Sequence, residues 1–476
     1  MTDRLRSLWR DHAELIKGVL TSLVALLTVV ACVLPMGELP LWNGEKPAHR
    51  NQYELMAEAF LDGRLDFAYG DEDSLAGLEN PYDPEARKQA GVSYHWDHAY
   101  YNGRYYMYFG VVPVFLVFLP YRLLTGAALT TYHATQLFAA ASIIGIFVLF
   151  QLLWKRFFGS LPYGVYLCLS VAVSVMSVWY SAAEPALYCT AITAAIALMI
   201  WSLYFFIRAV FVEERENRQL LLAAVGALLG ALAFGCRPPI ALANLLVIPM
   251  LIVFLRQRKF TPKLLGKLTL AALPYVFVGV SLMLYNAARF DDPFEFGQAY
   301  QLTVADQSQY RVTLDGSMLV RLVNGFGEQF FDVNGMTATF PYLRTSGVFF
   351  NFPMLFLCFG AVDGGVREGL RKNRLAGLAL GLLGAVLVIT ALDIMWSPYL
   401  LERYRMDIYF LMGIECFLIV GLWYESAGVR TRRWMTAVVA VMSVVTVISA
   451  FLLCLCRINV YYPDRVAAIA AALGLG

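Results

Sequence analysis

Apolar runs alternate with polar segments along the whole chain, and they indicate its fold class. Each run is close to the roughly 20 residues that a helix needs to cross the hydrocarbon of a bilayer. The runs lie near 16–35, 131–152, 161–180, 186–207, 219–235, 239–255, 268–286, 346–362, 375–393, 406–424 and 434–455. The pattern therefore predicts an all-α polytopic membrane protein with about eleven transmembrane helices.

One further apolar run, 109–127, is ambiguous. It contains Pro113 and Pro120, and its apolar stretch ends at Tyr121-Arg122, which is short for a full crossing. If it does not cross, Lys and Arg gather in the loops on the side of the amino terminus, as the positive-inside rule requires of cytoplasmic loops. If it does cross, most of these charges move outside. We therefore predict a re-entrant or surface-lying helix at 109–127, with the amino terminus in the cytoplasm and the carboxyl terminus outside.

This topology divides the chain into seven segments. They are a cytoplasmic tail (1–15), the first transmembrane helix (16–35), a first extracytoplasmic loop (36–108), a bundle that includes the re-entrant helix (109–286), a second extracytoplasmic loop (287–345), the rest of the bundle (346–457) and an extracytoplasmic tail (458–476). Each of the two loops holds an amphipathic stripe, at 53–61 and at 318–331. Both stripes predict helices that lie in the membrane interface or pack on the bundle.

Composition narrows the class further. Only 15% of the residues are charged and 59% are hydrophobic, whereas soluble chains are about a quarter charged. A net charge of +2 gives no basic surface and argues against a nucleic-acid partner. The eight cysteines all lie in or beside apolar runs, so we expect neither structural disulfides nor thiol chemistry. No small-residue cleavage site follows the first run, which is expected to remain as a helix.

A candidate general base lies in the first loop. Residues 96–110 combine acidic and aromatic side chains with a Gly turn just before an apolar run. Asp97 is surrounded there by bulky aromatics close to the membrane surface, where desolvation raises the pKa of a carboxyl and suits it to take a proton. The alternatives are that Asp97 caps a helix or pairs with Arg104. Asp83 is the second candidate, although Asn80-Pro-Tyr-Asp-Pro84 is more typical of a turn.

Two short patterns suggest a metal, and neither is favoured. His95 and His98 have a spacing that suits one helical face, but no third ligand is evident. The run Asp71-Glu72-Asp73 has the oxygen ligands that Ca²⁺ or Mg²⁺ prefers, yet such runs are more often solvated loops. We expect no metal or other cofactor to be required, with a divalent ion as the alternative.

Basic residues at the predicted outer ends of the spans form a second set. Arg237, Arg403 and Arg405 lie on the side that the positive-inside rule disfavours. Guanidinium groups at headgroup depth suit capture of a phosphate. The alternatives are ion pairs with Glu184, Glu402 or Asp407, or contact with anionic lipid. Glu184, at another outer turn, is expected to bind sugar hydroxyls or to orient an arginine.

Several patches resemble one family of membrane enzymes. They lie at 101–113, 115–126, 234–238, 285–290, 294–297 and 402–407. With the layout of spans and loops, they are similar to the GT-C superfamily of integral membrane glycosyltransferases, in particular its protein mannosyltransferase and aminoarabinose transferase branch. The resemblance covers most of the chain in layout but only these patches in sequence.

The resemblance implies transfer of a sugar from a polyprenyl-phosphate donor on the extracytoplasmic face, with an acidic residue of the first loop as general base. Related enzymes carry an acidic pair before the first interface helix, where this chain has Arg50-Asn51-Gln52-Tyr53. The expected base is therefore Asp97, followed by Asp83 and Glu54. Inverting transfer to a hydroxyl of a glycan, lipid or protein acceptor is expected, in a prokaryotic plasma (inner) membrane.

Roles for the other candidates follow from the same resemblance. Arg237, Arg403 and Arg405 are expected to hold the donor phosphate. Sugar or acceptor is expected to contact the following residues: Glu184, Tyr101, Asn102, Tyr105 and Tyr404. The alternative functions are a polymerase or ligase of lipid-linked glycans, a transporter or flippase of such lipids, and a non-catalytic scaffold. A transporter usually shows internal repeats and charges at mid-membrane, and the sequence displays few of either.

Overall fold

The computed structural model describes residues 2–33, 51–185, 187–310, 312, 315–396 and 400–475, with the side chains of 2–11 and of Glu72 left aside. The predicted loop segment 36–50, with Arg50, lies outside the described residues, as do the last two residues of the predicted span 16–35.

Ten helices in the described part of the chain are long and apolar enough to cross a membrane. They are His12–Val33 within α1 (Thr2–Val33), α5 (Thr131–Phe157), α6 (Tyr163–Ala183), α7 (Leu187–Phe211), α8 (Glu216–Phe234), Pro238–Arg256, α11 (Pro262–Phe290), α15 (Ala376–Trp396), Glu402–Ser426 and α17 (Val429–Asn459). Each matches a predicted apolar run to within a few residues. The prediction of an all-α integral membrane protein is confirmed, while its sidedness stays a prediction.

The predicted span 346–362 differs from the other ten. It consists of the four-residue helix α13 (Val348–Asn351) and the 3₁₀-helix η6 (Pro353–Val362). Pro353 lacks an amide hydrogen and forces the preceding residue out of the helical region, and Phe352 accordingly adopts φ −134° and ψ 83°. The break makes this segment a pair of short helices rather than one long crossing helix.

The ambiguous run 109–127 also forms a short element. A five-residue π-helix, η4 (Val114–Phe118), continues into the seven-residue helix α4 (Leu119–Thr125). At about 1.5 Å per residue, this pair spans well under the roughly 30 Å of hydrocarbon. Its length therefore agrees with a segment that does not cross, and the side on which it lies stays a prediction.

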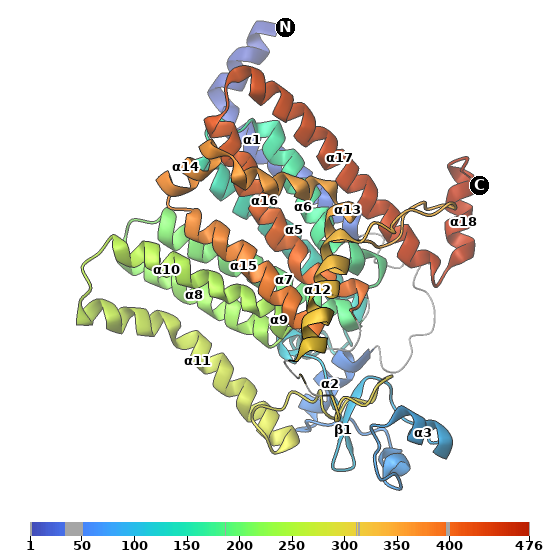
Figure 1. The fold of residues 1–476 in the computed structure, drawn as a ribbon. Coiled ribbons are helices and arrows are strands. Elements are labelled where there is room, and N and C mark those ends of the chain that lie inside the picture. Colours follow the sequence, from blue (N-terminus) through green and yellow to red (C-terminus); the bar gives the residue numbers. More distant parts are fainter. Residues whose placement is uncertain are drawn as a thin grey trace.

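The centre of the bundle is formed by α16 (Met406–Ser426), which is the most deeply buried of the long helices. Glycines let its neighbours approach closely, as is usual between membrane helices. Gly413 faces Val173 of α6, and Gly421 faces the ring of Phe158, which follows α5. At the other extreme α11 is the least buried long helix, and it leans along the edge of the bundle beside α8 (Figure 1).

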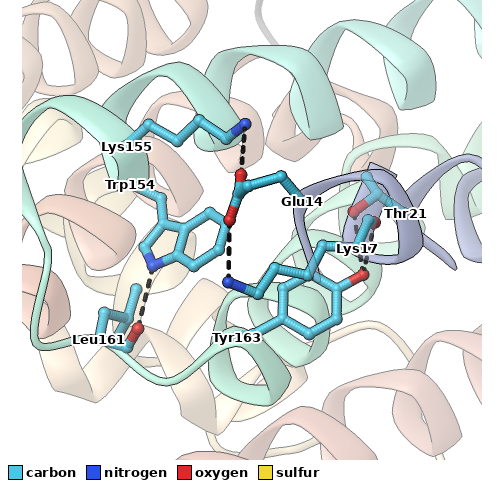
Figure 2. Close-up of polar contacts among 7 residues, drawn as sticks. All are labelled: Glu14, Lys17, Thr21, Trp154, Lys155, Leu161 and Tyr163. Atoms are coloured by element: carbon cyan, nitrogen blue, oxygen red, sulfur yellow. Dashed lines mark hydrogen bonds and ion pairs between the residues drawn. The ribbon is translucent and has the colours of Figure 1, made fainter. Parts of the chain in front are cut away.

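A polar cluster fastens α1 to the bundle near the amino-terminal end (Figure 2). Glu14 accepts from Lys17 at 3.0 Å and pairs with Lys155 of α5 at 3.3 Å. The hydroxyl of Tyr163, at the start of α6, donates to the carbonyl oxygen of Lys17 at 2.9 Å and lies 3.1 Å from the hydroxyl of Thr21. One helix with little buried surface is thus tied to two others.

The first loop folds into a small lobe at the end of the bundle away from the amino terminus (Figure 1). It contains α2 (Gln52–Leu61), the 3₁₀-helix η3 (Glu72–Leu75), α3 (Pro84–Ala90) and an antiparallel hairpin of β1 (His98–Tyr101) and β2 (Arg104–Met107). The predicted stripe of α2 packs on the short apolar helix pair, where Tyr53 stacks on Phe118 and Phe60 on Phe115.

The chain after α11 returns to the same lobe and joins it. Gln301 forms a bridge with Ala99 of β1. The guanidinium of Arg87, in α3, donates at 2.7 Å to the carbonyl oxygen of Thr303. These contacts place residues 297–307 against the first loop, at the end of the bundle that carries the lobe.

The remaining elements connect or flank the long helices. They are α9 (Pro238–Ala241), η5 (Leu242–Leu246) and α10 (Val247–Arg256), which together make up the span Pro238–Arg256, then α12 (Gly316–Phe331), α14 (Gly364–Lys372), η7 (Glu402–Arg405) and α18 (Pro463–Ala472). The predicted second stripe forms α12, where Gly325 packs on Ile394 of α15.

Candidate active site

A cavity of about 670 Å³ lies where the lobe meets the ends of the long helices. Its walls come from the residues on either side of the hairpin (96–97 and 108–111), from α7, from the turn between α8 and α9, from the end of α11, from residues 294–307, from the end of α15 and from η7. Four of the predicted site residues line it: Asp97, Arg237, Arg403 and Tyr404.

Asp97 lies at the end of the loop that precedes β1. Its backbone has a positive φ of 55°, a region that Asp tolerates better than most residues. The amide of Asp97 donates to the carbonyl of Leu302 at 2.9 Å, and its own carbonyl accepts from the side chain of Gln52 at 3.1 Å. With both backbone groups bonded, the carboxylate is held at the cavity although Asp97 is only 5% exposed.

Two side chains donate to the carboxylate of Asp97. The amide of Gln301 donates to Oδ1 at 2.9 Å, and the hydroxyl of Tyr188, in α7, donates to Oδ2. Neither predicted alternative for Asp97 is realised, because Asp97 caps no helix and Arg104 pairs with Asp66 at 3.9 Å. The carboxylate is thus oriented by neutral donors and lies at a hollow large enough for a ligand.

The contacts of Asp97 lead through Tyr188 to a cation, Arg403 in η7. Its guanidinium lies 4.2 Å from the ring centroid of Tyr188 and 5.7 Å from that of Tyr404. Cations bind favourably over such ring faces. Among the described residues Arg403 forms no ion pair with a carboxylate, and it lines the cavity half-buried. Its positive charge is therefore available to an anionic ligand.

Arg237, in the turn between α8 and α9, is held differently. Its Nε donates to both carboxylate oxygens of Asp407, at 2.7 and 2.9 Å, and its Nη2 lies 4.0 Å from Asp393. Both acids are buried, in α16 and α15 respectively. The predicted alternative of a pair with Asp407 is realised here. Arg237 nevertheless lines the cavity, as does Asp393, and the two acids fix the position of its guanidinium.

Aromatic and amide side chains complete the polar part of the wall. They include Trp96, Tyr108, Trp396, Gln298 and Gln307. Burial raises the pKa of Tyr108 to about 12, so its hydroxyl stays protonated at neutral pH. Aromatic rings suit packing against the apolar faces of a sugar, and amide groups suit hydrogen bonds with its hydroxyls.

The rest of the lining is largely apolar. It includes Phe109, Val111, Phe234, Leu242, Leu282, Phe294 and Phe296. A lining that combines apolar and polar groups is typical of a site for an amphiphilic ligand.

Six predicted site residues lie away from this cavity. Asp83 caps α3, accepting from the amide of Glu85 at 2.9 Å. Arg405 is buried and does not line the cavity, and its Nη2 donates to the carbonyl of Glu328 at 3.5 Å. Glu184 forms an ion pair with Arg457 of α17 at 2.6 Å, so it joins two ends of helices.

The three predicted residues of the hairpin also point elsewhere. The hydroxyl of Tyr101 donates to Asp291 at 3.1 Å, and Asn102 occupies the turn with φ 48°. Tyr105 is fully buried and stacks among the aromatics of the lobe. Glu54, the third candidate base, accepts from the amide of Thr131 at 2.7 Å, at the start of α5.

The residues proposed as alternative metal ligands are bonded within the lobe. His95 pairs with Asp71 at 3.0 Å, and His98 contacts the hydroxyl of Tyr69 at 2.8 Å and the carbonyl of Trp96 at 2.9 Å. Over the described residues, no group of three or more His, Cys, Asp or Glu side chains is arranged to hold a metal ion.

Three residues of the site escaped sequence reasoning. Tyr188 lies within an apolar span and Gln301 within a loop, and neither carries a local signal. Asp393 did carry one, because an acid within an apolar run is a functional candidate by default.

Comparison with known proteins adds no relative. No family model, no curated protein and no solved structure matches the chain.

Proposed function

We propose that this integral membrane protein is a glycosyltransferase, which moves a sugar from a polyprenyl-phosphate donor to an acceptor hydroxyl at the extracytoplasmic face. The observation that carries the proposal is the chain of contacts from Asp97 through Tyr188 to Arg403. A carboxylate thus faces the same cavity as a cation that has no ion-pair partner among the described residues, and a single tyrosine separates the two. Base and leaving-group stabiliser are the two functions that glycosyl transfer from a phosphate requires.

In the proposed reaction Asp97 accepts the proton of the acceptor hydroxyl. The hydroxyl oxygen attacks the anomeric carbon, through a transition state with oxocarbenium character. The bond from the anomeric carbon to the phosphate oxygen breaks, and its electron pair leaves with the polyprenyl phosphate. A single displacement of this kind inverts the anomeric carbon.

The two arginines take different parts in this proposal. Arg403, without a carboxylate partner among the described residues, binds the phosphate and stabilises the charge that grows on it. Arg237 is already paired with Asp407 and Asp393, whose charges offset its own, so in this proposal it shapes the cavity and does not bind the phosphate. The apolar lining residues suit the first isoprene units of the lipid, and the amides and tryptophans of the lining suit the sugar.

A transfer assay with a matched pair of acid variants tests the proposal. Purified protein in detergent is given a panel of radiolabelled polyprenyl-phosphate sugars, with glycan, lipid and peptide acceptors that carry free hydroxyl groups. Asp97→Asn is expected to lower transfer by about 10²- to 10⁴-fold, because the amide keeps the backbone conformation but takes no proton. Asp83→Asn is the control, since asparagine caps a helix as well as aspartate does. Its activity is expected to stay near the wild type.

The outcomes separate the competing functions. Loss of transfer in Asp97→Asn and in Arg403→Gln, with thermal stability retained, supports the proposed roles. Transfer that survives Asp97→Asn but is lost in Asp83→Asn moves the base to Asp83. Saturable binding of the donors with no transfer to any acceptor argues instead for a transporter of lipid-linked sugar.

A further inference from the structure

A third arginine of the cavity wall, Arg289, differs from both arginines of the proposed mechanism. It lies at the end of α11 and is only 5% exposed. Its Nη1 donates to the carbonyl of Met107 at 2.7 Å, and its Nη2 donates to the side-chain oxygen of Asn286 at 2.8 Å. The rings of Tyr285 and Phe290 lie over its guanidinium, at 4.0 and 4.5 Å.

Arg289 has no carboxylate in contact among the described residues. Arg237 and Arg457, which are half-buried at this end of the protein, pair with Asp407 and Glu184 respectively. The buried Arg87 and Arg405 also contact no carboxylate among the described residues, but neither of them lines the cavity. Glu295 acts on Arg289 electrostatically but forms no ion pair with it. Its Nε is buried and bonds no described group. A buried cation held only by neutral groups is unfavourable unless an anion arrives.

The surroundings of Arg289 are separate from those of Arg403. Arg403 contacts the rings of Tyr188 and Tyr404, on α7 and η7. Arg289 contacts β2 and its own helix. The two sets of neighbours share no residue, although both arginines line the same cavity. The cavity therefore has two separate positions, at Arg403 and at Arg289, that can bind a negatively charged group.

We infer that Arg289 is the anchor of a second anion site, which binds an anionic oxygen group of the acceptor, a phosphate or a carboxylate. The assignment of this anion to the acceptor rests on the proposed function, whereas the anion site itself does not depend on it. Each Nη has a second N–H besides the one that bonds Met107 or Asn286, and these N–H groups would bind the anion while Asn286 and Met107 keep the guanidinium in place. The acceptor would then be held through its anionic group at Arg289, while the donor phosphate lies at Arg403.

A binding experiment tests the second site without requiring transfer. The affinity of inorganic phosphate, and of acetate in a parallel series, is measured by calorimetry on the purified protein, with and without saturating polyprenyl phosphate. Because Arg403 is proposed to bind phosphate too, the second site is measured as the anion binding that remains when polyprenyl phosphate saturates the protein, and we expect such binding. Stronger remaining binding of phosphate than of acetate identifies a phosphorylated acceptor, and the reverse order identifies a carboxylate. Loss of all binding of both anions in the presence of polyprenyl phosphate overturns the site.

One conservative variant makes the test specific. Asn286→Asp keeps the shape of the side chain and places a carboxylate 2.8 Å from Arg289, so it supplies the missing counter-charge from within. It is expected to weaken the binding of the small anion at least tenfold and to leave polyprenyl phosphate unaffected. Arg403→Gln is expected to weaken the binding of polyprenyl phosphate and to leave the binding of the small anion at the second site unaffected. Asn373→Asp, in the turn after α14 and away from the cavity, controls for an added negative charge.

The failures are distinguishable. If Asn286→Asp binds the small anion as the wild type does, the second site is wrong whatever the transfer assay gives. If the anion results hold but no donor supports transfer, the site stands and the proposed glycosyltransferase falls.

Discussion

Tyr188 shows how much one residue contributes at this site. Its hydroxyl donates to Asp97 while its ring lies under the guanidinium of Arg403. A tyrosine is suited to this double contact because it has an apolar ring face and a polar tip. The residue comes from the first turn of α7, so a membrane helix sets the distance between the proposed base and the proposed phosphate ligand.

Tyr188→Phe separates the two contacts. The ring and its contact with Arg403 remain, while Asp97 loses one of its two donors. We expect donor affinity within threefold of the wild type and a turnover rate lower by about tenfold.

Tyr180→Phe is the matched control for this change. Its hydroxyl donates to Glu184 at 3.3 Å, away from the cavity. Equal turnover rates for Tyr188→Phe and the wild type would contradict the role given to the hydroxyl.

At the scale of elements, the site depends on where the lobe docks on the bundle. Gly110, just after β2, touches the turn between α8 and α9, and the amide of Val112 donates to the carbonyl of Gly235 at 3.0 Å. Arg237 follows in that same turn. A close approach of two backbones thus aligns the wall that carries Asp97 with the wall that carries Arg237, and only glycine leaves room for it at position 110.

Gly110→Ala tests this docking. An added Cβ would collide with the carbonyl oxygens of Gly235 and Cys236, which are backbone atoms that cannot turn aside. We expect a loss of about 1–3 kcal/mol of stability, seen as a lower Tm, together with reduced donor binding. Gly279→Ala in α11 is the control, because its Cβ would meet no atom within 4 Å and alanine favours a helix by up to about 1 kcal/mol. A Tm for Gly110→Ala as high as that of Gly279→Ala would contradict the proposed alignment.

At the scale of the whole molecule, the candidate site occupies one end of the bundle and the amino terminus the other (Figure 1). The lobe, the Arg237 turn and the end of α11 meet at the site end, while the cluster around Glu14 lies near the opposite end. This arrangement suits an enzyme whose lipid substrate enters from the membrane and whose second substrate approaches from the aqueous side. Which side that is follows only from the positive-inside pattern.

Labelling of single added cysteines tests the sidedness. Glu79→Cys in the lobe and Arg430→Cys at the start of α17 both replace exposed residues. With a membrane-impermeant maleimide on spheroplasts, we expect Glu79→Cys to react at once and Arg430→Cys only after permeabilisation. The wild type gives the background, because all eight native cysteines are buried or half-buried. The reverse pattern would place the cavity in the cytoplasm and remove the polyprenyl-phosphate donor as an extracytoplasmic substrate.

The sequence by itself determined the class of the protein and ten of its long helices, because the length of an apolar run is a local property that needs no partner. It also pointed to Asp97, Arg237, Arg403 and Tyr404, since charge and aromatic side chains at the ends of spans are unusual enough to notice. It missed the break at Pro353 within the predicted span 346–362. The hydropathy of this segment predicted one long helix, whereas proline disfavours a helical conformation at the residue before it.

Only the tertiary structure decided which of the candidate groups share a cavity. Asp83 and Asp97 look alike in the sequence, yet one caps a short helix and the other faces the hollow. Glu184 finds Arg457, distant by 273 positions, and Arg237 finds Asp407, distant by 170. The physical reason is that an ion pair or a cavity wall depends on how helices pack against each other, and no local pattern of residues carries that information.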